Sequence, residues 1–355
     1  MELFRRFKHA IRRFPEASLR LKRQIGLSLM GIPWNQTVTV LYAPKIGNKI
    51  DKKRQITDSL TISTSENSGF GFQLEHHFVP RYSIQLKDAL IHCHTGNVFL
   101  RNDVTNNWEL VKEFSEWPIE SRAVFAKRPK PHQTYLRLEG AYLNGFISSN
   151  HYHQITEDIP SLLAIFDNQK IVAREKDFDK LATFGLSNFQ SHLDNEFIQV
   201  ATLDILTKGN DVGYLHPRSR ELLLNHSRSY MNNKAFRHIY LSRLNHRRTI
   251  PNEMDVIQIL ESRGFEIIDP GELSLDKQIS LFSEAKVVIA PHGGAITNMI
   301  FSQEARLLEL MPSSRVNRCF EWQAKICGQV YEVLFFDDKL GIKIDELKIA
   351  LQRLS

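Results

Sequence analysis

Apolar and polar positions alternate most regularly in the last third of the chain. Short apolar runs, which are typical of buried strands, are separated by segments with an apolar residue at every third or fourth position, the period of an amphipathic helix. The expected strands are 238–243, 265–269, 286–290, 306–311 and 329–336. The expected helices are one capped by Asn252 and ended by Gly264, one that starts at Ser274, one after PHGGAITN, 317–327 and 343–354. Strands that alternate with helices in this way predict a parallel sheet with helices on both faces.

The first two thirds of the chain follow a weaker pattern. Strands are expected at 36–43 and, as short pieces such as ALIHC and NVFL, within 83–125, and a helix is expected over 151–167. Residues 216–236 are polar with one apolar patch, which is typical of a connecting segment. The chain is therefore divided into an arm at 1–25, an N-terminal domain at 26–215, the connecting segment at 216–236, a C-terminal Rossmann-like domain at 237–340 and a terminal helix at 341–355.

The positive charge of the protein is concentrated at its N-terminus. The chain of 355 residues carries a formal net charge of +6, and residues 1–25 alone hold eight basic and two acidic side chains. Because the remainder is neutral overall, a nucleic-acid-binding body is excluded. The arm also carries an apolar stripe of Leu3, Phe4, Phe7, Ile11 and Phe14. A basic helix with such a stripe suits either the surface of an anionic membrane or packing on the body of the protein.

The sequence contains neither a membrane span nor a secretion signal. No apolar run approaches the ~20 residues that a span needs, and no apolar signal-peptide core is present. The three cysteines, Cys93, Cys319 and Cys327, are too few and too scattered for a disulfide framework or a zinc site. We therefore expect a cytoplasmic protein, which the arm could attach to the inner face of the membrane.

Three polar clusters follow expected strands of the C-terminal sheet, where open parallel sheets bind ligands. Arg243 and Arg248 lie in SRLNHRR, and arginine forks suit phosphate oxygens, although a solvated basic loop is the alternative. His292–Asn298 joins a buried strand to a helix, so its paired glycines could bring backbone N–H groups to an anion or simply form a tight turn. Glu309 would contact a ligand hydroxyl or pair with an arginine.

A fourth cluster lies in the segment NHYHQITEDIP, which begins at Asn150. His153 and Glu157 are four residues apart, so they share one face of a helix and could form an acid–base pair or serve a structural role. Glycine-rich dinucleotide and phosphate-loop fingerprints, HExxH and the Gly-x-Ser-x-Gly elbow are absent from the sequence. Asp177 and Asp179 have the Asp-x-Asp form of a metal–diphosphate site, but their charged surroundings favour a solvated turn.

Together these segments resemble glycosyltransferase family 61, which includes bacterial capsular polysaccharide transferases and eukaryotic O-linked N-acetylglucosaminyl- and xylosyltransferases. The resemblance covers roughly residues 140–335 and is carried by IYLSR, RRxxxNE, SLDKQISLFSEAKVVIAPHGGAITN and LLELMP. NHYHQITEDIP is similar to the family motif NxYHWxxDxLP. The chain departs from the family at Gln154, where an aromatic is usual, at Ser161, where Arg is common, and in HGGA for HGAG.

The resemblance implies an α/β protein of GT-B type, with two Rossmann-like domains facing across a cleft. It implies an inverting, metal-independent transferase that moves a sugar from a nucleotide-sugar, with uridine diphosphate as the first carrier to consider. The acceptor would be a glycan or lipid-linked glycan, as in the synthesis of capsular or other surface polysaccharide. The family also allows the terminal helix to cross back onto the N-terminal domain.

The resemblance assigns roles to named residues. Glu157 would be the general base, with His153 and Asp158 as alternatives. The donor would be held by Arg243, Arg248, Asn252, His292, Gly293, Gly294, Ala295, Thr297, Asn298 and, at its ribose, Glu309. Two other classes of protein remain open, a catalytically inactive nucleotide- or sugar-binding protein and a different Rossmann-type enzyme.

Overall fold

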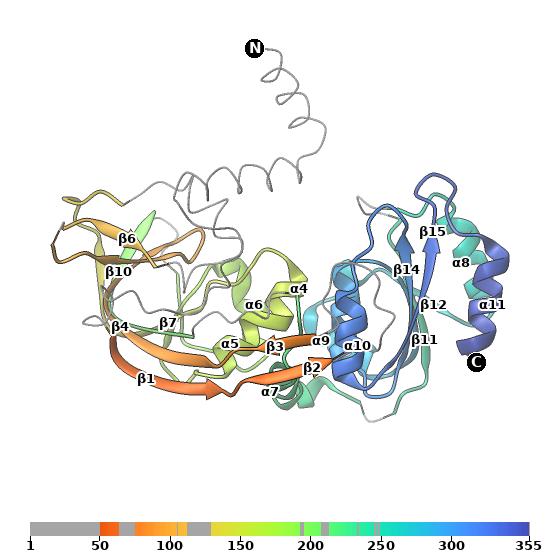
Figure 1. Ribbon diagram of the computed structural model, residues 1–355, viewed down its shortest axis with the longest axis horizontal. Coiled ribbons are helices and arrows are strands. Elements are labelled where there is room, and N and C mark those ends of the chain that lie inside the picture. Colours follow the sequence, from red (N-terminus) through yellow and green to blue (C-terminus); the bar gives the residue numbers. More distant parts are fainter. Residues whose placement is uncertain are drawn as a thin grey trace, which may run out of the picture.

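A computed structural model describes most of the chain beyond the N-terminal arm (Figure 1). The described residues are 50–63, 75–104, 106–111, 129–191, 195–206, 213–232, 234–244, 246 and 249–354. The arm at 1–25, the strand expected at 36–43 and Arg248 lie outside this part of the chain.

The C-terminal half contains the parallel sheet that the sequence predicts. Its spatial order is β12-β11-β13-β14-β15, and all neighbouring strands run parallel. The strands are β11 (Arg237–Leu241), β12 (Glu266–Ile268), β13 (Ala285–Pro291), β14 (Arg306–Pro312) and β15 (Val330–Phe336). In chain order this arrangement is 2-1-3-4-5, so the direction of winding reverses between β11 and β13. Such a switch point leaves a crevice at the carboxyl ends of the two strands.

Helices cover both faces of this sheet, which confirms the mixed α/β prediction (Figure 1). They are α8 (Glu253–Glu261) and α11 (Ile344–Leu354) on the outer face, and α9 (Leu275–Ser283), α10 (Cys319–Cys327) and the 3-10 helix η7 (Gly294–Phe301) on the inner face. Side chains alternate along each strand. Tyr240 therefore joins the outer core, whereas Ile239 and Leu241 join the inner one.

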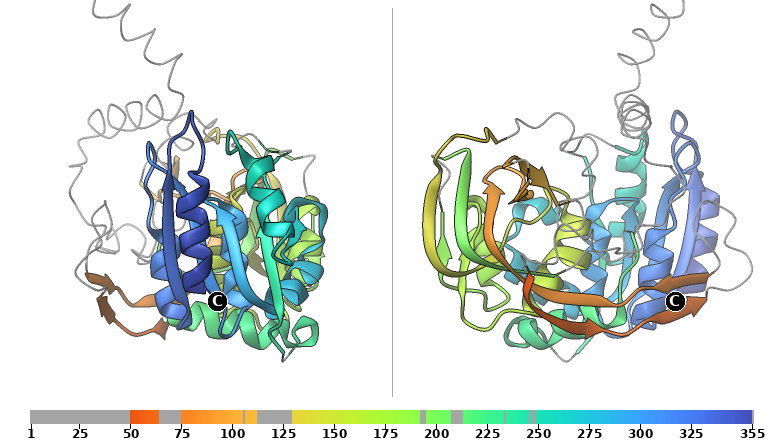
Figure 2. Two further views of the ribbon diagram at one scale, coloured as in Figure 1. Left: turned by 90° about the vertical axis from the view of Figure 1, so that its right-hand side faces the viewer. Right: turned by 60° about the vertical axis from the view of Figure 1, so that its left-hand side comes forward.

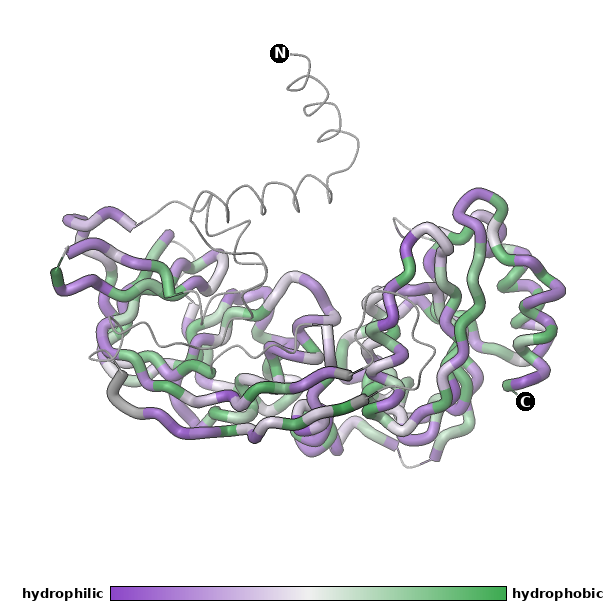
Figure 3. The backbone as a smooth tube through the Cα atoms, in the orientation of Figure 1, coloured by the Kyte–Doolittle hydropathy of each residue, from purple (hydrophilic) through white to green (hydrophobic). Residues whose placement is uncertain are grey.

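The terminal helix α11 belongs to the C-terminal half. It alternates hydrophobic and hydrophilic residues (Figure 3), and its apolar positions Leu347, Leu351 and Leu354 are buried in the outer core with Val256 of α8. These positions recur at intervals of four and three, so they form the single stripe that α11 can bury. The expectation that this helix crosses back onto the N-terminal half is therefore wrong.

The N-terminal half is built on an eight-stranded mixed sheet of order β6-β5-β4-β10-β7-β8-β9, with β1 paired to β4. Its strands are β1 (Ile50–Thr57), β4 (Arg81–His92), β5 (Val98–Arg101), β6 (Trp108–Leu110), β7 (Leu136–Asn144), β8 (Lys170–Val172), β9 (Phe189–Gln190) and β10 (Phe197–Leu206). β10, β7, β8 and β9 are parallel, and the other pairs are antiparallel. The switch point of the parallel part lies between β7 and β10.

The helices of this half follow β7 and β8. They are α4 (His151–His153), the π-helix η3 (Gln154–Asp158), α5 (Ile159–Leu163), the 3-10 helix η4 (Glu175–Asp177) and α6 (Phe178–Ala182). The segment expected to connect the halves contains α7 (Pro217–Ser227) and the 3-10 helix η5 (Arg228–Tyr230), and α7 packs against α5. Among the helices that the structure describes, none combines the length and the apolar character needed to cross a bilayer.

A separate two-stranded ribbon links the halves along the base of the molecule (Figure 2). It consists of β2 (Leu60–Ser63) and β3 (Glu75–Phe78), which pair antiparallel. His76 of β3 stacks on Tyr214, with ring centroids 3.8 Å apart, and Tyr214 meets the edge of Trp322 on α10. The ribbon therefore reaches from the N-terminal sheet to a helix of the C-terminal half.

One hydrophobic core is shared by the two halves. It joins Ile155 and Ile159 of the N-terminal helices to Ile296 of η7 and Phe320 of α10, all of which are at most 2% exposed. This common core fixes how the helix after β7 meets the helix after β13.

Asn252 holds the chain around β15 and α11 in place. It stands at the N-cap position of α8, as expected, but its side chain makes no capping hydrogen bond. Instead its Nδ2 donates to the carbonyl of Ile342 over 2.9 Å, and its Oδ1 accepts the Ile342 N–H over 2.8 Å. The amide of Asn252 thus already has backbone partners, so a role in donor binding has no support from its contacts.

Replacement of Asn252 should lower stability without affecting nucleotide binding. Asn252→Ala removes two hydrogen bonds worth about 1 kcal/mol each, so the free energy of unfolding should fall by about 2 kcal/mol in urea denaturation. Exposed Asn225 on α7 provides the control, and Asn225→Ala should stay within about 0.5 kcal/mol of the wild type. Weakened nucleotide binding by Asn252→Ala at unchanged stability would restore Asn252 as a donor ligand.

Candidate functional site

A cavity lies where the switch point of the C-terminal sheet predicts one. It has a volume of about 260 Å³ and contains residues that follow β11, β12 and β13. The lining includes Ser242, Arg243, His246, Asp269, Gly293, Gly294, Ala295 and, from the N-terminal half, His151. A second cavity of about 280 Å³ shares Arg243 with the first and is also lined by His292 and Arg315. Arg243 is therefore common to both.

Arg243 lies against the backbone that follows β13. Its Nη1 donates to the carbonyl of His292 over 2.8 Å. A Cβ atom on Gly293 would stand only 2.8 Å from the same nitrogen, so a larger residue would push the guanidinium away. Gly294 has more room, because its nearest neighbour would be His151 Cβ at 3.7 Å. Of the paired glycines, Gly293 is the one that this packing requires.

Glu253 of α8 supports Arg243 from behind. The carboxylate is 1% exposed, and its Oε1 accepts the Arg243 backbone N–H over 2.7 Å. The hydroxyls of Tyr240 and Ser242 donate to the same oxygen over 3.1 and 3.2 Å. Burial, followed by the charge of Glu253, raises the pKa of Tyr240, so its phenol remains a donor. This cluster fixes the backbone from which Arg243 extends.

The loop and helix after β13 divide into an open and a buried part. His292, Gly293, Gly294 and Ala295 are partly exposed and line the cavities. Thr297 and Asn298, in contrast, are 0% exposed. The first four of these expected donor ligands can therefore face a ligand, whereas the last two lie behind them.

A chain of amides connects the two halves through Asn298. Gln278 of α9 donates its Nε2 to the carbonyls of Pro270 and Leu273, so its Oε1 accepts from Asn298 Nδ2, at 2.6 Å. Asn298 Oδ1 then accepts from His151 Nε2, at 3.0 Å. Because each amide has only one acceptor end, the hydrogen of a neutral His151 must lie on Nε2.

Glu309 holds His292 from the next strand. Its side chain is 0% exposed and points to the inner face of the sheet, as the alternation with Leu308 and Leu310 requires. Oε1 lies 2.5 Å from His292 Nδ1, and Oε2 accepts the Tyr331 hydroxyl over 2.7 Å. Burial, followed by the charge of Glu309, raises the pKa of Tyr331, so this hydroxyl also donates. Both carboxylate oxygens thus have partners within the chain.

The expected acid–base helix forms with a π-helical turn at its centre. α4, η3 and α5 run without a break from His151 to Leu163, and Ile159 N–H bonds to Gln154 O, five residues back. Pro160 has no N–H to give to the carbonyl of Thr156, which favours such a widened turn. π-Turns inside helices often occur at functional sites.

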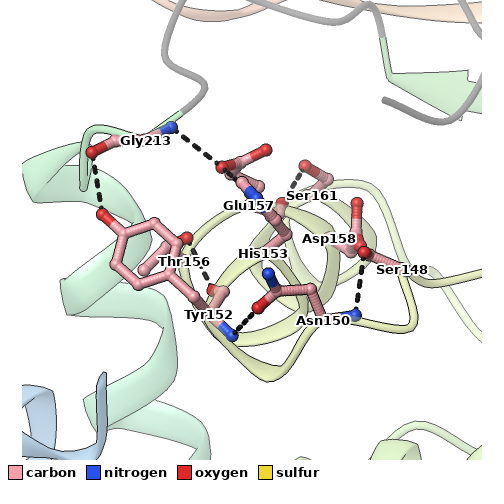
Figure 4. A network of polar contacts seen from close by, with 9 residues as sticks. All are labelled: Ser148, Asn150, Tyr152, His153, Thr156, Glu157, Asp158, Ser161 and Gly213. Carbon is pink, nitrogen blue, oxygen red and sulfur yellow. Dashed lines mark hydrogen bonds and ion pairs between the residues drawn. The ribbon is translucent and has the colours of Figure 1, made fainter. Parts of the chain in front are cut away.

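His153 and Glu157 share one side of this helix, as their spacing predicts (Figure 4). His153 Nδ1 lies 2.7 Å from Glu157 Oε1, which also accepts the N–H of Gly213 over 3.2 Å. Glu157 is 7% exposed. The carboxylate therefore orients the imidazole, an arrangement that acid–base sites use.

Asp158 faces a different environment. Its Oδ2 accepts the Ser148 N–H over 2.6 Å (Figure 4). Asp158 also lines a small cavity with Arg81 and Ser161. The structure thus brings His153 and Glu157 together and turns Asp158 away. As the described residues define it, the lining of the Arg243 cavity includes His151 but neither His153 nor Glu157.

The first aspartate of the Asp-x-Asp segment lies in a buried ion pair with Arg174. Asp177 is 5% exposed and accepts from Arg174 Nε over 2.6 Å, so the expected solvated turn is wrong for this residue. Across the described ranges, no three His, Cys, Asp or Glu residues are grouped as metal ligands would be.

Sequence reasoning missed several residues at the site. In the sequence, Glu253 stands out only as the last residue of RRxxxNE, and His151 only as a neighbour of His153 in NHYHQITEDIP, so neither pattern indicates a role for it. Asp269, Gln278 and Tyr331 are also positioned at or behind the cavities, as is His246, which belongs to the SRLNHRR cluster that the sequence indicates. Only Asp269 had a local signal, since an acidic residue directly after a strand of a parallel sheet lies at the ligand-binding edge.

His151 should make stability depend on pH. Burial lowers its pKa to about 4, even though the bond to Asn298 raises it. Below its ordinary value of 6.5 the unfolded chain takes up a proton that the folded chain refuses, so stability falls as the pH falls from 6.5 towards 4. His151→Gln keeps a donor for Asn298 and does not titrate. Between pH 7 and 5 its free energy of unfolding should decline less than that of the wild type, by up to about 1.4 kcal/mol per pH unit. If the free energies of unfolding of the wild type and His151→Gln decline equally between pH 7 and 5, this account of His151 is wrong.

Comparison with known protein families completes the description of the site. The family model described as Glycosyltransferase 61 matches residues 151–308. The match begins at His151, at the start of α4, includes Arg243 and the His292–Asn298 segment, and ends one residue before Glu309. No curated protein matches the chain. The resemblance found in the sequence is confirmed, because residues 151–308 of this protein match the model of the Glycosyltransferase 61 family.

Proposed function

We propose that this protein is an inverting, metal-independent glycosyltransferase that moves a sugar from a nucleotide-sugar to a glycan acceptor. The family supports glycosyltransferase activity. The observation that carries the finer proposal is the cavity at the switch point, where Arg243 and the backbone of Gly293 and Gly294 meet His151. It provides a cation and close backbone approach for a diphosphate, next to the helix that carries the acid–base pair.

The donor side would bind and stabilise the leaving group. When the bond between the anomeric carbon and the phosphate oxygen breaks, its electron pair stays on the diphosphate. Arg243 donates to that growing charge, and the N-terminal end of η7 adds backbone N–H groups at Gly294 and Ala295. Arg248, which lies outside the described residues, is proposed as the second arginine. Because Glu309 already has two partners in the chain, we assign it the orientation of His292.

The acceptor side would supply the base. An acceptor hydroxyl attacks the anomeric carbon from the face opposite the diphosphate, and its proton must be removed as the new C–O bond forms. Glu157 is the proposed base, with His153 held against it. His153 Nε2 is the alternative proton acceptor, because Nδ1 faces the carboxylate.

The GT-B arrangement is part of this proposal. The sheet of each half contains parallel strands with a switch point, and the helix after β7 contacts the helix after β13 through His151 and Asn298. We further propose a uridine diphosphate carrier, a glycan or lipid-linked acceptor in surface polysaccharide synthesis, and a cytoplasmic location. Attachment to the inner membrane face through residues 1–25 stays a prediction, because these residues lie outside the described part of the chain.

One observation favours a second candidate function, the binding of nucleotide or sugar without transfer. His153 and Glu157 are not among the described residues that line the Arg243 cavity. A binding protein would take up nucleoside diphosphates and show no turnover with any donor and acceptor. The family match argues against the other alternative, a different class of Rossmann-type enzyme.

Loss of Arg243 should weaken donor binding. Arg243→Ala leaves a diphosphate without its charged partner, so the Kd for UDP should rise by about 30- to 1,000-fold in calorimetry, equivalent to 2–4 kcal/mol. Arg306→Ala, at the amino end of β14, removes the same charge from the opposite edge of the sheet and should leave the Kd unchanged. Turnover should persist in a chelator. If the chelator abolishes turnover and Mg²⁺ or Mn²⁺ restores it, the arginine account is wrong.

Loss of the Glu157 carboxylate should slow the chemical step. Glu157→Gln keeps the shape of the side chain and removes the proton acceptor, so kcat should fall by ~10²- to 10⁴-fold while UDP affinity stays the same. Asp158→Asn, one residue away, should have a much smaller effect because Asp158 faces Ser148. Near-wild-type turnover of Glu157→Gln together with inactive His153→Ala would assign the base to the imidazole. Full activity of all three variants would show that the helix is structural.

A further inference from the structure

Asp269 is a charged residue in the cavity that the proposed reaction does not use. It follows β12 directly, and β12 lies beside β11 in the sheet, so its side chain stands at the same edge as Arg243. It lines the cavity with Arg243 and Gly294, and its side chain is 17% exposed. A ligand at Arg243 therefore lies within the same enclosure as this carboxylate.

The carboxylate of Asp269 is held in one orientation. Its Oδ1 accepts the N–H of Gly271 over 2.9 Å. His246 Nε2 lies 2.9 Å from Oδ1 and 3.1 Å from Oδ2. These contacts come from both sides, one from the 3-10 turn η6 (Pro270–Glu272), which Asp269 caps, and one from the loop after β11. A group fixed in this way needs no reordering when a ligand binds.

The same contacts keep Asp269 charged. Burial raises its pKa, but the hydrogen bonds from His246 and Gly271 outweigh burial and lower the pKa overall. An ionised carboxylate only accepts hydrogen bonds, and its two oxygens offer about four lone-pair directions. It would repel a phosphate and attract hydroxyl groups. Two adjacent hydroxyls can bind it together, each donating to one oxygen.

The observed partners of Glu309 leave the proposed donor site without a ligand for ribose. Glu309 is 0% exposed, and His292 and Tyr331 contact its two oxygens. We propose that Asp269, oriented by His246, binds the vicinal hydroxyls of the donor ribose while Arg243 holds the diphosphate. This inference rests on the proposed function, because it assumes a nucleoside diphosphate in the cavity.

The test compares UDP with an analogue that lacks one ribose hydroxyl and with the diphosphate group alone. Calorimetry with the full-length protein would measure UDP, 2′-deoxy-UDP and inorganic pyrophosphate. The wild type should bind UDP about 10- to 100-fold more tightly than 2′-deoxy-UDP, as expected for a hydrogen bond to a charged group. Asp269→Asn should abolish this ratio by weakening UDP binding, and should leave the Kd of pyrophosphate unchanged.

Controls separate this inference from general damage and from the proposed function. Glu272→Gln alters an exposed acid in the same 3-10 turn and should keep the wild-type ratio. The role of Asp269 would be overturned, with nucleotide binding intact, if Asp269→Asn kept the wild-type ratio of the Kd values for 2′-deoxy-UDP and UDP. The same conclusion would follow if only Glu309→Gln lost this ratio. If the wild type binds UDP, CDP, GDP and ADP no better than pyrophosphate, the proposed donor class fails as well. A preference for the ribose form over the 2′-deoxy form, found with one of the other bases, would support the same inference with that base.

Discussion

The relative position of the two halves depends on one shared hydrophobic core. Ile155 and Ile159, from the helix after β7, are buried with Ile296 and Phe320, from the inner face of the C-terminal half. Separating these surfaces would expose apolar side chains, at a cost of about 1.5–3 kcal/mol for each large one. The seam is therefore a packed interface, and it brings His151 to Gly294 at the edge of the cavity. Every polar contact between the halves at this edge is built on that packing.

Each polar group at the cavity is held by a second group behind it. Glu253 holds the backbone of Arg243, and Glu309 holds His292. A buried carboxylate needs donors: the hydroxyls of Tyr240 and Ser242 donate to Oε1 of Glu253, and the hydroxyl of Tyr331 donates to Oε2 of Glu309. The site is thus ordered before any ligand arrives, which is the condition under which a fixed cation stabilises a leaving diphosphate efficiently.

The strands of the C-terminal sheet were predictable because they are bounded by helices with a clear apolar stripe, and because β11, β13 and β14 contain runs of buried residues. The order of those strands and the contacts of Glu309 were not, since they depend on neighbours such as Tyr331 that are distant in the sequence. The spacing of His153 and Glu157 did predict their contact. The position of α11 was misjudged because its stripe shows that it packs but not against which partner.

Position along one helix decides which acid of the motif can work with His153. Residues four apart share a helix face, so Glu157 lies over His153. Asp158, one residue further along, faces another side of the helix and accepts the N–H of Ser148. The π-turn over Gln154–Asp158 contains both acids, and Pro160 makes this wider turn less costly because it leaves the carbonyl of Thr156 without its helical donor. Two adjacent carboxylates of one motif thus have different partners, and only one of them can orient the imidazole.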